Sequence, residues 1–182
     1  MAHSLLDRLR RINHMIAILI GVMLLICAAV ILLDIVMRQL GTSLGGTDEI
    51  SGYVMAIATS WGMAYTLLEL GHVRIDLLRG KVGPRGRAVF DLTSLVVLAS
   101  TVSLTAVMAW PVLARSLANG STANTPLETP LAWVQGPWFL GWVWFAVVSW
   151  LTFIAALRLV MDGAFSQSEA AIGTFGEEET AL

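Results

Sequence analysis

The side chains best suited to chemistry lie in two short polar stretches that flank a long uncharged run. Arg38, Asp48 and Glu49 precede this run, and His72 and Asp76 follow it. The four-residue spacing of His72 and Asp76 places both side chains on one face if the stretch is helical. Groups of this kind form ion pairs at helix ends when they lie near the membrane surface, and serve ion or substrate pathways when they lie deeper.

The uncharged parts of the chain decide between these two roles. Four long runs contain no Asp, Glu, Lys, Arg or His, and they cover residues 15–33, 50–68, 92–114 and 131–157. A pump or coupled transporter normally carries ionisable groups or broken helices near the bilayer midplane. Asp34 lies just beyond the first run with Arg38 one helical turn later, so we expect a local ion pair there. The pattern favours structural roles over a transport pathway within this chain.

Catalytic and cofactor chemistry have little support in the sequence. Cys27 is the single cysteine, which excludes an intrachain disulfide or a cysteine-based metal site. We find no Ser/His/acid grouping and no phosphate-binding glycine loop, and we predict no enzyme activity, no cofactor and no metal. An alternative stays open, because His14 and His72 map to the same membrane boundary and a haem between them would indicate a membrane anchor or cytochrome-type subunit of a respiratory complex.

The composition is that of a membrane protein. Of 182 residues, 57% are hydrophobic and 13% charged, against roughly 25% charged in soluble domains. Each run is long enough to span a bilayer, which takes about 20 residues, and the first is longer than the roughly 7–15-residue core of a signal peptide. We predict an all-α membrane protein with a single four-helix domain over residues 1–162 and an acidic, disordered tail over 163–182. The predicted helices cover residues 13–38, 49–70, 88–117 and 131–160.

The distribution of Lys and Arg predicts the orientation. Nine of the eleven basic residues fall before the first run, between the second and third, or after the fourth. By the positive-inside rule, both termini and the basic elbow between the second and third helices are cytoplasmic. We expect this elbow to face anionic lipid headgroups, and its small size argues against nucleic-acid binding. Its lipid-facing residues are predicted to be Arg79, Lys81, Arg85 and Arg87.

The second predicted helix carries a stripe of small side chains. Gly52, Ala56, Ser60 and Ala64 recur every four residues. Such stripes let helix backbones approach closely in lipid. The neighbour is either another helix of this chain or a helix of another subunit.

Several of these residues together carry a resemblance to a known family. Arg38, the acidic pair Asp48 and Glu49, the step Trp61-Gly62 and the elbow from Gly71 to Asp76 occur in an order that resembles the small permease subunit of TRAP transporters, the DctQ-like family. The four-helix plan with both termini inside is similar over nearly the whole chain.

The resemblance implies a supporting role in the bacterial inner membrane. In that family a large permease subunit carries the sodium and substrate sites, and a periplasmic substrate-binding protein delivers an organic acid. The small subunit scaffolds the large one. By position, the resemblance implies structural or interface roles for Arg38, Asp48, Glu49, Gly62, His72 and Asp76.

Overall fold

The chain folds almost entirely into helices. The computed structural model describes residues 2–72 and 79–173. Its helices are α1 (Ala2–Gln39), α2 (Thr47–Leu68), α3 (Pro84–Asn119), α4 (Leu131–Met161) and α5 (Phe165–Ile172), with a 3₁₀ turn η1 (Arg79–Lys81) before α3. Within the described ranges the one β pairing is an isolated bridge between Thr122 and Pro130. The predicted all-α class is confirmed for this part of the chain.

Three helices are long and apolar enough to cross a membrane. They are α1, α3 and α4, among the residues that the structure describes. The 22-residue α2 also carries hydroxyl side chains, including Ser51, Thr59 and Thr66, which lower its hydropathy. The count of four spanning helices therefore stays a prediction.

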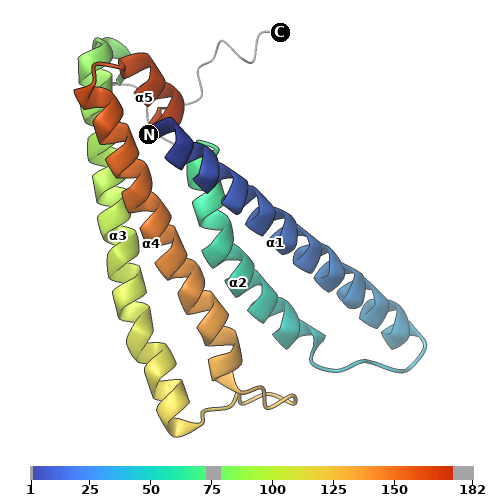
Figure 1. The fold of residues 1–182 in the computed structure, drawn as a ribbon. Coiled ribbons are helices and arrows are strands. Elements are labelled where there is room, and N and C mark those ends of the chain that lie inside the picture. Colours follow the sequence, from blue (N-terminus) through green and yellow to red (C-terminus); the bar gives the residue numbers. More distant parts are fainter. Residues whose placement is uncertain (1, 73–78, 174–182) are drawn as a thin grey trace.

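The four long helices form a row in the order α1, α2, α4, α3, and the row bends into a V (Figure 1). The pair α1–α2 and the pair α3–α4 meet near the N-terminus and spread apart toward the α1–α2 and α3–α4 loops. The buried core lies mostly where the pairs meet, with Leu68, Leu95, Phe145 and Leu159 among its members. Helix α4 contacts α1 and α5 as well as its two neighbours in the row, whereas α1 leaves most of its apolar stretch uncovered within the chain.

The ends of the chain contain more helix than the sequence analysis expected. Helix α1 begins at Ala2, ahead of the predicted residue 13, because Leu6 and Leu9 lie one turn apart and pack into the core. Helix α5 occupies part of the tail that was expected to be disordered, and it buries Ala171 and Ile172 in the same core. These tertiary contacts stabilise segments that have weak helical patterns of their own. The acidic residues 177–179 lie outside the described residues.

Helices α2 and α4 approach each other closely at one glycine. A side-chain carbon added at Gly141 would meet Ser60 Oγ and would lie 2.9 Å from Trp61 Cδ1. Ser60 and Ala64 are fully buried, so this half of the small-residue stripe has its neighbour inside the chain. Open space surrounds the position of Gly52 at the other end of α2. The stripe thus serves α2–α4 packing over half of its length.

We predict that Gly141→Ala destabilises the protein while Gly136→Ala, on the same helix, does not. Alanine favours a helix over glycine by about 1 kcal/mol, but overpacking at the α2–α4 contact costs about 1–3 kcal/mol. An added carbon at Gly136 meets open space. In thermal melts of detergent-solubilised protein, Gly141→Ala should melt at least roughly 4 °C below Gly136→Ala. Equal melting temperatures would contradict the close approach.

Candidate functional site

The polar side chains gather in two clusters, one near each end of the long helices. The first, called here the Asp34 cluster, joins the end of α1 to the start of α2 and comprises Asp34, Arg38, Ser43, Thr47 and Asp48. The second, called here the Asp91 cluster, joins η1, α3 and α5 and comprises Arg79, Arg87, Asp91 and Glu169.

Asp34 is the centre of the first cluster. Its residue is 1% exposed, and four donors surround its carboxylate. They are Leu44 N at 2.7 Å, Arg38 Nε and Thr47 Oγ1 at 2.8 Å, and Ser43 Oγ at 2.9 Å. Both carboxylate oxygens accept two of these bonds, so the buried charge is well compensated. Asp34 thereby fixes the turn between α1 and α2.

The expected ion pair between Asp34 and Arg38 is confirmed. Arg38 Nη2 lies 2.7 Å from Asp34 Oδ2 and 3.8 Å from Asp48 Oδ2. The Asp48 side chain is 93% exposed, so its contribution to stability is small. The four-residue spacing predicts only a local pairing role for Asp34, whereas this residue has the most hydrogen-bond partners in the cluster. The available signal was the pair of hydroxyl residues Ser43 and Thr47, nine and thirteen residues after Asp34.

Glu49 lies beside the α3–α4 loop, where it lines a pocket together with Thr125 and Pro126. Tyr53 Oη donates a hydrogen bond of 2.6 Å to Glu49 Oε1. The loop side chain of Leu127 lies so close to Gly46 that a carbon added there would sit 2.5 Å from it. Gly46 also has φ +70, a conformation that favours glycine. Asp48 therefore lies beside Arg38 at the end of α1, and Glu49 lies beside the α3–α4 loop.

The elbow residues are only partly described. The His72 ring lies 6.1 Å from the ring of Phe145 on α4, centroid to centroid. Asp76 falls outside the described residues, so the expectation that His72 and Asp76 share one helix face stays a prediction. Gly62 lies in α2, where an added carbon meets open space.

The Asp91 cluster holds α5 against the start of α3. Arg79 binds Asp91 through two bonds, Nε to Oδ1 at 2.9 Å and Nη2 to Oδ2 at 3.0 Å. Arg79 Nη2 also donates to Glu169 Oε1 at 2.8 Å, and Arg87 Nη1 lies 3.4 Å from the same oxygen. The hydrogen bonds to Asp91 raise the pKa of Arg79 above its ordinary value. Two-pronged arginine–carboxylate pairs of this kind are strong and directional.

This cluster changes the expectation for the basic elbow. Arg79 was predicted to face lipid, but its side chain is 12% exposed and points into the Asp91 cluster. Arg87 is partly exposed and lies beside Glu169. Lys81 and Arg85 are exposed, so they keep the predicted role. The sequence does not indicate that Asp91, twelve residues after Arg79, is buried and accepts hydrogen bonds from it.

Three further polar contacts tie the helices together and were missed in the sequence, and one of them is a 2.9 Å bond from Trp150 Nε1 on α4 to Ser103 Oγ on α3. Asn13 on α1 is fully buried, and its Oδ1 accepts a 3.1 Å hydrogen bond from Trp144 Nε1 on α4. Trp61 Nε1 donates a 2.9 Å bond to the carbonyl of Pro137. Indole N–H groups usually find a partner when they are removed from water. Nothing in the local sequence links residues that lie this far apart along the chain.

Hydroxyl side chains along the middle of the helices form hydrogen bonds within their own helix. Thr93, Thr101 and Ser149 each donate to the backbone carbonyl one turn earlier, which satisfies a hydroxyl inside an apolar environment. The described geometry can hold helices together at their ends, and it offers no chain of ionisable groups from one end to the other.

We predict that the Asp34 cluster is essential to stability and that Asp34 is its decisive member. Asp34→Ala leaves Arg38, Thr47 and the Leu44 amide without their acceptor, and the melting temperature in detergent should fall by roughly 5–10 °C. Asp48→Ala removes the exposed partner of the same arginine and should change it by no more than about 2 °C. The reverse order of effects would refute the assignment.

Comparisons with known proteins identify the family. No curated protein and no solved structure gives a match to the chain. The family model described as "Tripartite ATP-independent periplasmic transporters, DctQ component" matches residues 27–159, well over half of the chain. The match includes Asp34 and Arg38, both loops and most of α4. The chain belongs to the DctQ family, the small permease subunits of tripartite ATP-independent periplasmic (TRAP) transporters.

Proposed function

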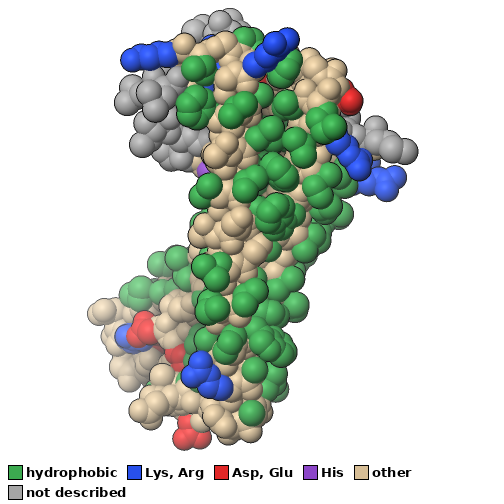
Figure 2. Space-filling view, turned by 90° about the vertical axis from the view of Figure 1, so that its left-hand side faces the viewer, with side chains coloured by type: hydrophobic (Ala, Val, Ile, Leu, Met, Phe, Trp, Pro, Cys, Tyr) green, Lys and Arg blue, Asp and Glu red, His purple; other side chains and the backbone are tan. Residues whose placement is uncertain are grey.

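We propose that this subunit is a scaffold for the large TRAP permease, which performs the ion-coupled uptake, with sodium as the coupling ion and an organic acid as substrate. The observation that carries this proposal is the placement of charge. Figure 2 shows hydrophobic side chains along the visible face and charged side chains near its two ends. Each long helix has an uncharged middle section, so the coupling ion and substrate are expected to bind elsewhere.

The uncovered surface of α1 supports a role within a larger assembly. Only 6% of the most apolar 18-residue stretch of α1 is buried inside the chain, against 39% of the corresponding stretch of α4. Exposed aliphatic side chains such as Leu25 and Leu32 need lipid or another protein to cover them. We propose that lipid covers part of this surface and the large subunit another part, and that the periplasmic substrate-binding protein docks on the assembled complex.

We further propose that α2 is the fourth spanning helix and that both termini are cytoplasmic in the bacterial inner membrane. The distribution of basic residues supports this orientation. The exposed Lys81 and Arg85, before and at the start of α3, lie at the same end of the molecule as the start of α1, which carries Arg8 and Arg11. Under this proposal the Asp34 cluster faces the periplasm, and residues 1–162 form one membrane domain.

We predict that the isolated subunit transports nothing and that uptake needs both membrane subunits. Co-expression with the large permease should give a complex that survives affinity purification. Vesicles with both subunits and the binding protein should then take up the organic acid with a sodium gradient. Vesicles that contain this subunit alone should show no uptake above empty vesicles. Gradient-driven uptake by the subunit alone would overturn the scaffold role.

Labelling from one side of the membrane tests the span of α2. In a Cys27→Ser background, single cysteines at the exposed positions Thr42 and Lys81 flank α2 on its two sides. If α2 spans, an impermeant maleimide should label Thr42→Cys from the periplasm and label Lys81→Cys only after lysis. Labelling of both positions from the same side would exclude a spanning α2.

A further inference from the structure

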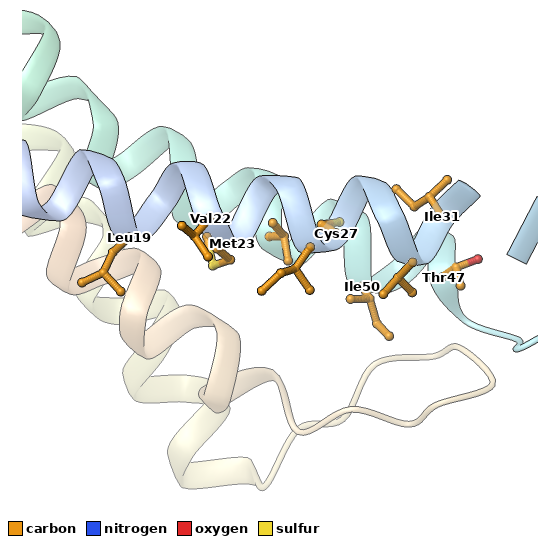
Figure 3. A pocket seen from close by; sticks show the side chains of 10 residues that line it. Leu19, Val22, Met23, Cys27, Ile31, Thr47 and Ile50 are labelled. Carbon is orange, nitrogen blue, oxygen red and sulfur yellow. The ribbon is translucent and has the colours of Figure 1, made fainter. Parts of the chain in front are cut away.

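A groove runs between α1 and α2 toward the Asp34 cluster (Figure 3). It has a volume of about 420 Å³. Its lining is aliphatic apart from Cys27 and Met23 and from Thr47 at one end. The lining residues are Leu19, Val22, Met23, Ile26, Cys27, Val30, Ile31, Thr47, Ile50 and Val54.

The length of the groove matches one leaflet of a bilayer. On α1 the lining extends from Leu19 to Ile31, a rise of about 18 Å at about 1.5 Å per residue. One leaflet contributes about 15 Å to the roughly 30 Å hydrocarbon core. Toward the N-terminus the groove stops at Leu19, short of the start of the uncharged run at residue 15, so it does not extend along the whole apolar length of α1.

The volume of the groove also favours a thin occupant. The groove offers about 420 Å³, which suits a single flexible hydrocarbon chain. Leu19 and Ile26 line it and stay largely exposed, so nothing within the described chain covers them.

The polar end of the groove has the charge pattern of a receptor for a zwitterion. Thr47 lines the groove, and its Oγ1 lies 3.4 Å from Arg38 Nη2. Arg38 is half exposed and Asp48 almost fully exposed, with 3.8 Å between them. Arg38 suits a phosphate oxygen, and Asp48 suits an ammonium group. Together with Asp34 the cluster has a net charge of −1, which disfavours a headgroup that is negative overall.

We propose that this groove binds one acyl chain of phosphatidylethanolamine, in the leaflet next to the α1–α2 loop. The phosphate binds Arg38 and the primary ammonium group binds Asp48. The bound lipid covers the aliphatic face of α1 and braces α1 against α2 beside the Asp34 cluster. This proposal concerns the subunit itself and does not depend on its scaffold role.

Native mass spectrometry can test the groove. The full-length protein is released from nanodiscs that contain equal amounts of phosphatidylethanolamine and phosphatidylglycerol. The wild type should retain one phosphatidylethanolamine molecule. Ile26→Trp fills the groove and should reduce retention about tenfold. Leu25→Trp adds the same ring at a neighbouring exposed position outside the lining and should retain the lipid. Equal retention in both variants would overturn the proposal.

A second variant tests the headgroup contact without touching the groove. Asp48→Asn removes an exposed charge, and should reduce the preference for phosphatidylethanolamine over phosphatidylglycerol about tenfold. An unchanged preference, or a wild type that retains both lipids equally, would overturn the headgroup assignment. In the complex with the large subunit, a photo-crosslinker at Met23 should capture lipid. Capture of the large subunit would show that a protein segment occupies the groove instead.

Discussion

The structure depends first on the buried carboxylate of Asp34. A charge placed at the end of a membrane helix is costly unless donors surround it, and here four donors from the α1–α2 turn do so. Each donor comes from a different residue between Arg38 and Thr47, so the carboxylate determines the path of the whole loop. Asp34 thereby links the end of α1 to the start of α2 at one end of the groove.

At the opposite end of the long helices, ion pairs between arginine and carboxylate side chains stabilise the structure. The arginine pairs of the Asp91 cluster connect η1, α3 and α5, and the buried core lies beside them. Between the two ends the contacts include van der Waals packing at Gly141 and indole hydrogen bonds from Trp61, Trp144 and Trp150. Polar groups at the ends and close packing in the middle are what a bilayer demands of helices.

A row of helices has consequences that a closed bundle would not have. Of the three longest helices, α1 at the edge of the row keeps the largest share of its apolar stretch uncovered within the chain. Such a shape is poorly suited to enclosing a pathway and well suited to lying against a larger partner. In a family of small TRAP subunits, this geometry agrees with a supporting role.

The sequence by itself determined the all-helical membrane class, the approximate positions of α2, α3 and α4, the Asp34–Arg38 pair and the family. These follow from hydropathy, from four-residue spacing and from the order of a few motif residues, all of which are local. Only the tertiary structure decided that Arg79 turns inward to Asp91, that α5 is helical, and that Gly141 and Asn13 are contact points. Each of these depends on a partner at least twelve residues away along the chain, and no local pattern specifies which residue that partner will be.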